Sequence, residues 1–295
     1  MYEERVANHK SAVQKLEEIK LRNAGNQTAK NGTIDSIVHA KNEFVYLDHE
    51  TKYFFDFQVF LEMPFFSLKK ETLHADKTWH RENNTAILIR HKNEVEAPTI
   101  KDKTTFIFVL SQILHHLNYN RAATTPTNIA IPTVRYFQAT NSAKSGRDYL
   151  RLKKSLERLC AAEFTLCFNQ NGNTRSVTFK IFENGHISEK EIKVSISKWT
   201  KHTITNKEVL KLDNNYIYTR GAITRRIYEI CRKHCGKKNR FSIRTEVLLR
   251  RIGSTSKSLR FIYQEIKKFN ETELGYVIKP ERNGFLSITP KQLTP

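Results

Sequence analysis

Four basic side chains at helical spacing are the residues of this sequence best suited to chemistry. They are Arg147, Arg151, Lys154 and Arg158. At about 100° per residue on a helix, all four point within roughly 60° of one another. Such a stripe can bind phosphates, and each arginine can also donate two parallel hydrogen bonds to guanine. A solvated helix surface has the same pattern, so the stripe alone leaves both interpretations open.

The helix that would carry this stripe is predicted from the apolar residues on its opposite face. These are Tyr149, Leu152, Leu156 and Leu159. Their spacing of three and four residues predicts an amphipathic helix from near Gly146 to near Cys160. Lys144 and Ser145 stand at its expected start.

The segments around this helix follow the order of a winged helix-turn-helix. Apolar spacing predicts a helix over 101–118, a β segment follows at 128–131, and Pro132 opens a second helix that ends before 141–145. After the third helix, alternating apolar residues predict strands on both sides of Asn171-Gly172, a hairpin-turn signal, and a further strand at 192–196. A strand is also expected at 85–91. Any small α+β domain remains an alternative to the winged helix on this evidence.

The second half of the chain repeats the order. A helix beginning near Tyr216 is followed by a break at Gly236, a β segment at 241–243, a helix over 245–251 and a last helix over about 256–269. A shift of 110 residues superposes the four apolar positions of the first amphipathic helix on Leu259, Ile262, Ile266 and Phe269. Asn283-Gly284 then stands where Asn171-Gly172 stood. A repeated supersecondary unit indicates two domains of the same fold.

The last helix of the second copy also has a polar face. Its members are Lys257, Arg260, Gln264 and Lys268, with Ser256 before them. They combine side chains that bind phosphates with side chains that read bases. Phe261 on the same face could contact a thymine methyl or pack on a neighbouring element.

The charge of the chain fits a polyanionic partner. Fifty Lys and Arg against 30 Asp and Glu give a formal +20 over 295 residues, and residues 219–269 hold fifteen basic and three acidic residues of these totals. Such an excess repels itself unless a polyanion binds. We expect the second unit to dominate the salt-dependent affinity for DNA.

The remaining composition predicts a cytoplasmic protein. No run of 18 apolar residues occurs and the N-terminus is charged, which excludes a membrane span and a secretory signal. The four cysteines lie in segments of expected regular structure, so we expect reduced thiols rather than disulfides.

These observations give an α+β fold class, with two tandem winged helix-turn-helix domains related by internal duplication and an N-terminal helical extension. Residues 3–22 show helical spacing and end in a polar breaker, so we assign residues 1–34 to a charged helix on a flexible tether. The first winged-helix domain is expected over 35–198 and the second over 199–295.

The sequence offers little for an enzyme. A rolling-circle nicking enzyme would need a His-x-His metal motif and a tyrosine nucleophile, and no His-x-His occurs. His115 and His116 are adjacent and point about 100° apart on a helix, so a structural role is expected. Cys231, His234 and Cys235 could hold part of a zinc site, but no second ligand pair follows, and core thiols are the preferred interpretation. Without a Walker-type loop, we expect no catalytic residues, metal or cofactor.

Several short motifs resemble the bacterial plasmid replication initiator protein A family. The stretch 105–159 carries the main resemblance, in particular Ser145-Gly146-Arg147-Asp148-Tyr149-Leu150-Arg151-Leu152-Lys153 and Leu156-Glu157-Arg158-Leu159. The segment Met63-Pro64-Phe65-Phe66-Ser67-Leu68 is also similar to the family, and so are Gly253-Ser254-Thr255-Ser256 and Leu274-Gly275-Tyr276. The resemblance extends from about Met63 to Pro290.

This resemblance implies an initiator with two winged helices that binds direct repeats in double-stranded plasmid origin DNA and helps to open it. It also implies the host initiator ATPase and the replicative helicase as partners, and a balance between monomer and homodimer. A winged-helix transcriptional regulator fits the two units equally well without the resemblance. The candidate DNA-binding residues are Lys144, Ser145, Arg147, Arg151, Lys154, Arg158, Ser256, Lys257, Arg260, Gln264 and Lys268.

Overall fold

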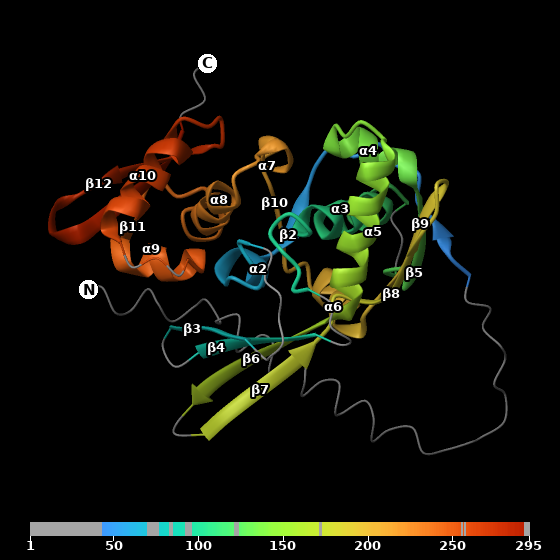
Figure 1. Cartoon of the computed structure of the whole chain (residues 1–295), viewed down its shortest axis with the longest axis horizontal. Coiled ribbons are helices and arrows are strands. Elements are labelled where there is room, and N and C mark those ends of the chain that lie inside the picture. Colours follow the sequence, from blue (N-terminus) through green and yellow to red (C-terminus); the bar gives the residue numbers. More distant parts are fainter. Residues whose placement is uncertain are drawn as a thin grey trace.

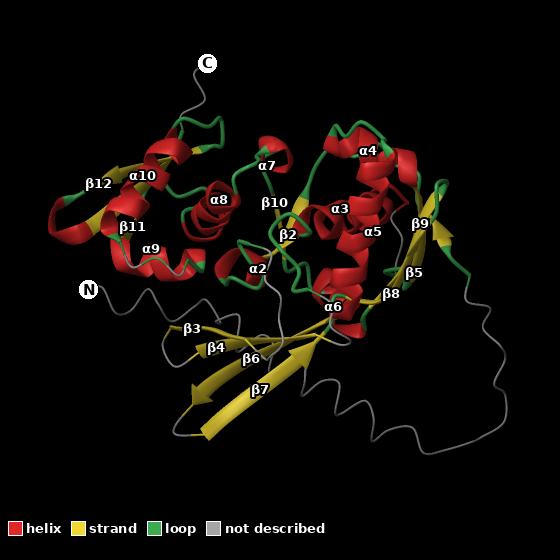
Figure 2. Cartoon of the chain, in the orientation of Figure 1, coloured by secondary structure: helices red, strands yellow, loops and turns green. Residues whose placement is uncertain are grey.

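The fold is mixed α/β, with helices between separate sheets (Figure 2). The computed structural model describes residues 43–69, 77–82, 85–91, 96–120, 124–170, 173–254, 256 and 258–291. The expected helix at 3–22, and the extension 1–34 with it, lie outside the described residues.

Three helices of the first half pack around a shared core. α3 (Lys103–Asn120) is buried from its start to Leu114, and α4 (Thr133–Thr140) and α5 (Gly146–Ala161) pack beside it. Pro132 precedes α4, which ends where Asn141 takes a left-handed backbone with φ of 51°. Ser145 and Asp148 form a capping box that starts α5, because each satisfies a backbone N–H of the other. The three expected helices are therefore confirmed.

One face of these helices is covered by a four-stranded sheet. Its order is β1 (Val45–Tyr46), β5 (Asn128–Pro132), β9 (Glu191–Ile196) and β8 (Phe182–Ile187). Ile129 pairs with Val194 at its centre, and both side chains are fully buried. The β8–β9 hairpin therefore packs against α5 through β8 and pairs through β9 with β5, the strand between α3 and α4.

The hairpin around Asn171-Gly172 belongs to a different sheet. β6 (Ala162–Gln170) and β7 (Asn173–Phe179) pair up to Gln170 and Asn173, and they extend a sheet with β3 (Lys77–Glu82) and β4 (Thr85–His91), in the order β3-β4-β6-β7. Figure 1 shows this sheet below the helices and apart from the β5-β9-β8 strands. Equating this hairpin with the one around Asn283-Gly284 is thus wrong, because β8 and β9 hold the corresponding place in the first half.

The segment that connects the two halves, which contains α6 (Lys198–Thr205) and β10 (Val209–Lys211), packs on the first half. α2 (Gln58–Glu62) follows β2 (Phe55–Phe57), which pairs with β10. Trp199 of α6 stacks on Phe179 with ring centroids 4.0 Å apart. The predicted boundary between Lys198 and Trp199 therefore falls inside a helix that packs on the first half, while the division into two domains stays a prediction.

The second half has its own helices and sheet. After α7 (Asn215–Tyr218) come α8 (Ala222–His234), β11 (Phe241–Arg244), α9 (Thr245–Ile252) and α10 (Leu259–Asn270), then β12 (Tyr276–Pro280) and β13 (Phe285–Pro290). Gly253 ends α9 with φ of 80°, and a 3₁₀ turn, Arg282–Gly284, joins the last two strands. The sheet order is β11-β13-β12.

The two halves share an order of elements. Helix, strand, helix, helix and two strands occur as α8, β11, α9, α10, β12, β13, and in the first half as α3, β5, α4, α5, β8, β9, where β6 and β7 are inserted between α5 and β8. In each case the last strand pairs between the other two. The shift of 110 residues also holds for three buried positions, which pair Leu152 with Ile262, Leu156 with Ile266 and Leu159 with Phe269. It fails at the fourth, since Leu259 is 43% exposed.

Candidate nucleic-acid interface

The start of α5 presents a lysine and a serine in defined positions. Lys144 is exposed and has a left-handed backbone with φ of 58°. The Ser145 hydroxyl donates to Asp148 Oδ2 at 2.7 Å and accepts from the Asp148 amide at 3.3 Å. The hydrogen bond from Ser145 lowers the pKa of the Asp148 carboxyl below its usual range. Ser145 thus starts the helix, and any contact with DNA would be in addition to that role.

Three of the four predicted stripe residues lie on the outer face of α5. Arg147, Arg151 and Lys154 are exposed, while Leu152 and Leu156 point into the core. The Arg151 side chain is 69% exposed and contacts Asp148 at 3.1 Å. A surface ion pair of this kind is worth little in water, so Arg151 can exchange it for an anionic ligand.

Arg158 is a correction to the predicted set. Its side chain is 10% exposed, and its guanidinium donates from Nη2 to Asp102 Oδ1 at 2.5 Å and also contacts Glu96 at 3.3 Å. A stripe drawn at 100° per residue extends along the whole helix, but this end of α5 is covered by the segment that leads into α3. Arg158 therefore joins α5 to α3 and does not face a ligand.

The start of α10 is built differently. Ser258 caps the helix by accepting from the Phe261 amide, and the partly buried Ser256 hydroxyl accepts from the Ser258 amide at 3.3 Å. Lys257 lies outside the described residues. Ser256 thus supports the turn before the helix.

The outer face of α10 carries the other predicted residues. Arg260 and Gln264 are exposed, and the Lys268 side chain is 65% exposed while it pairs with Glu265 at 2.6 Å. Phe261 is partly buried and packs against the core, which favours the packing interpretation over a contact with thymine.

Three further exposed side chains are not among the residues predicted from the sequence. Leu150 on α5 is 51% exposed and Tyr263 on α10 is 37% exposed, although most large apolar residues of both helices are buried. Each falls outside the apolar stripe of its helix, and that position was the available signal. Arg282 is exposed in the turn between β12 and β13, directly before the Asn283-Gly284 signal.

The Cys and His residues considered as alternative metal ligands lie in structural surroundings. Cys231 and Cys235 are buried in the second half, as predicted for core thiols, and burial raises the pKa of both. His115 stacks on Tyr53 with ring centroids 6.2 Å apart. In the parts of the chain that the structure describes, no group of three or more His, Cys, Asp or Glu residues could hold a metal.

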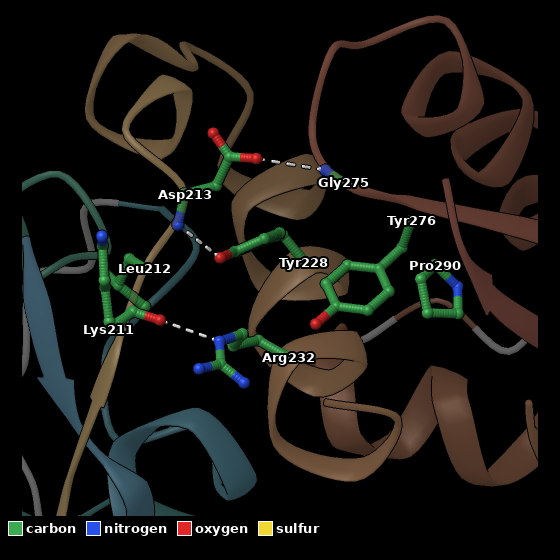
Figure 3. Close-up of a pocket in the computed structure, with 8 residues that line it drawn as sticks. All are labelled: Lys211, Leu212, Asp213, Tyr228, Arg232, Gly275, Tyr276 and Pro290. Carbon is green, nitrogen blue, oxygen red and sulfur yellow. Dashed lines mark hydrogen bonds between the residues drawn. The ribbon is translucent and has the colours of Figure 1, made fainter. Parts of the chain in front are cut away.

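A small pocket lies where the chain between the halves meets α8 and the last sheet (Figure 3). Its volume of about 250 Å³ is below the roughly 300–1,000 Å³ of most small-molecule sites. The lining polar groups bond to one another: Asp213 Oδ2 accepts from the Gly275 amide at 3.3 Å, and Arg232 Nε donates to the Lys211 carbonyl at 2.8 Å. The pocket is therefore better explained as a contact between elements of the fold than as a ligand site.

Comparison with known sequences identifies relatives that are named for replication. Residues 56–274 match the sequence model of the family named replication initiator protein A. A protein of Wigglesworthia glossinidia brevipalpis, named for a role in replication, is 31% identical over 205 residues, which are 66% of this chain and 73% of that protein.

Comparison with solved structures identifies a shared fold. Domains 2 and 3 of RctB, in a selenomethionine crystal structure, superpose with a TM-score of 0.57 at 12% identity, over 79% of this chain and 98% of that one. A second structure of RctB domains 2-3 gives 0.52 at 10% identity, over 79% and 96%. At this identity the likeness concerns the fold alone. Within the described residues, no helix is long and apolar enough to cross a membrane.

Proposed function

The chain belongs to the replication initiator protein A family, and on that premise we propose that it starts plasmid replication by binding repeated origin DNA. The binding is specific for sequence and uses two winged-helix units. In each unit the third helix, α5 or α10, enters the major groove.

The shared order of elements is the observation that carries this proposal. A helix, strand, helix, helix and two strands, with the last strand paired between the others, occurs in both halves, with β6 and β7 inserted before the two strands in the first half. This order supports a winged helix in each half, and we assign the β8–β9 and β12–β13 hairpins as the wings. Repetition of this order of elements, rather than of one periodic helix, supports two DNA-binding modules.

The exposed side chains of α5 and α10 support the choice of surface. Arg147, Arg151 and Lys154 are exposed on the face of α5 that points away from the core, and Arg260 and Gln264 are exposed in the same way on α10. Arginine and glutamine can read guanine and adenine in the major groove, and lysine can bind phosphates. The binding should therefore weaken steeply as salt rises.

We further propose that the protein acts without cutting DNA. No residue is assigned to catalysis, and neither a metal nor a cofactor is part of the proposed reaction. The host initiator ATPase, the replicative helicase and a second copy of this chain are partners that family membership makes reasonable to test.

Footprinting tests the proposal with the full chain on plasmid DNA that flanks its own gene. Protection of several direct repeats is expected. A single protected inverted site over a promoter would contradict initiation and favour a transcriptional regulator.

A nicking assay tests whether the protein cuts DNA. Incubation of the same plasmid DNA, in supercoiled form, with the protein and Mg²⁺ should leave the circles closed. Nicked circles joined to a tyrosine of the protein would favour a nicking enzyme.

A further inference from the structure

Four fully buried charges lie between the two halves of the protein. Asp56, Lys103, Arg226 and Glu229, here called the joint, are each at most 1% exposed. Asp56 and Lys103 belong to the first half, while Arg226 and Glu229 belong to α8 of the second. Figure 1 shows α8 and α2 between the two helices proposed to bind DNA, α10 and α5.

Arg226 satisfies the end of a helix in the other half. Its Nη1 donates to the carbonyls of Phe60 and Leu61 at 3.0 Å each, and its Nη2 donates to the carbonyl of Glu62 at 2.9 Å. The last carbonyls of a helix have no partner within that helix, and α2 ends at Glu62. The planar fork of an arginine can hold three such acceptors only from one direction, so this contact fixes α8 relative to α2.

Lys103 adds a second contact between the two halves, through ion pairs. Its Nζ lies 2.6 Å from Asp56 and 2.8 Å from Glu229, and Arg226 Nη1 is 2.7 Å from the other oxygen of Glu229. Two cations and two anions are thus matched among fully buried side chains. Moving one half relative to the other would separate buried charges, and such a loss is costly.

The chain that connects the two halves is hydrogen-bonded to both of them. Toward the first half, β10 pairs with β2, and the Leu212 amide donates to the Phe54 carbonyl at 2.8 Å. Toward the second half, the Asp213 amide donates to Tyr228 Oη at 2.6 Å, beside the bonds to Gly275 and Arg232 (Figure 3). No part of Lys211–Asp213 is therefore left to act as a hinge.

We propose that the joint sets the spacing between two half-sites that the protein reads on double-stranded DNA. This inference rests on the proposed function, since α5 and α10 are the groups being positioned. Asp56, Lys103, Arg226 and Glu229 are then positioning residues. They act on specificity through geometry and touch no base.

The test begins with duplexes that the full-length wild-type protein selects from a random pool. One base pair inserted between the half-sites turns one of them by about 35° and moves it by about 3.4 Å. The wild-type protein should lose at least about tenfold in affinity on this insertion. Equal affinity with and without the insertion, or selected sites that hold one half-site only, would overturn the inference. Absence of any sequence-specific site would instead overturn the proposed function.

Two matched variants test the joint itself. Arg226→Lys keeps the charge but loses the fork, and it should reduce the insertion penalty to less than about threefold while a single half-site is bound as before. Arg220→Lys makes the same change at an exposed position nearby and should behave as wild type. A folded Arg226→Lys protein with the full penalty would contradict the role of the joint. If Arg226→Lys does not fold, the wild-type insertion series still decides whether the two units are rigidly joined.

Discussion

Arg158 on α5 donates to both carboxylate oxygens of Asp102, the residue that precedes α3. The Nε–Oδ2 distance is 2.9 Å and the Nη2–Oδ1 distance is 2.5 Å. Asp102 also accepts from the Thr99 amide at 2.7 Å, so one carboxylate organises the start of α3 and the end of α5. The basic face of α5 is thus divided, since Arg158 fixes the helix while Arg147, Arg151 and Lys154 remain outside.

Arg158→Ala should destabilise the protein. Asp102 is 3% exposed, and removal of its partner leaves a buried charge unpaired, at a cost of about 3–5 kcal/mol. DNA binding should fall only in parallel with unfolding, as urea titration and DNA affinity would together reveal. A variant with normal stability and lost specific binding would return Arg158 to the DNA-contact set.

Arg151→Ala should have the opposite result. Its ion pair with Asp148 is on the surface, so the melting temperature should hardly change. Loss of a guanidinium that reads a base should cost about 1–3 kcal/mol of specific binding and relax discrimination at one position of the site. Unchanged affinity across a panel of single-base substitutions would exclude Arg151 from base reading.

Two glycines of the first half should respond differently to alanine. A Cβ at Gly185 on β8 would lie 2.7 Å from Leu156 on α5, while a Cβ at Gly146 would meet no atom within 4 Å. Gly185→Ala should cost about 1–3 kcal/mol, because the core at this contact has no room. Gly146→Ala should be neutral or stabilise by up to about 1 kcal/mol. Equal free energies of unfolding for the two variants would show that α5 does not pack on β8 as described.

His234 should make the stability depend on pH. Burial, and then the positive charge of Arg251, lower its pKa to about 3 from the ordinary 6.5. The unfolded chain therefore binds more protons at low pH, so the contribution is complete above about pH 6.5 and is lost as the pH falls toward 3.

His234→Gln isolates this effect, because the amide oxygen can still accept from Arg251 but does not titrate. Between pH 7 and pH 5 the stability of wild type should fall by about 1–2 kcal/mol more than that of the variant. A parallel decline in the two proteins would mean that His234 is protonated in the folded state at pH 5.

Local patterns predicted the elements well and their partners poorly. The apolar spacing on α5 and the pair Pro132 and Asn141 located helices within a few residues, because these signals act over a single turn. The pairing of β6 with β7 confirms the expected hairpin, but a turn signal does not reveal which sheet the two strands join. Arg158 was misassigned because Asp102, its partner, is 56 residues away in sequence. The joint was missed for the same reason, since Arg226 and Phe60 are 166 residues apart.

The most direct measurement of the central claim is the affinity of a full-length Arg147→Ala, Arg151→Ala, Lys154→Ala variant for the origin duplex protected by wild type. The variant should melt as wild type does, because all three side chains are exposed. Its specific affinity should fall at least about a hundredfold, while α10 retains part of the non-specific binding. A variant that is folded and binds the direct repeats as tightly as wild type would contradict the claim that α5 reads the DNA.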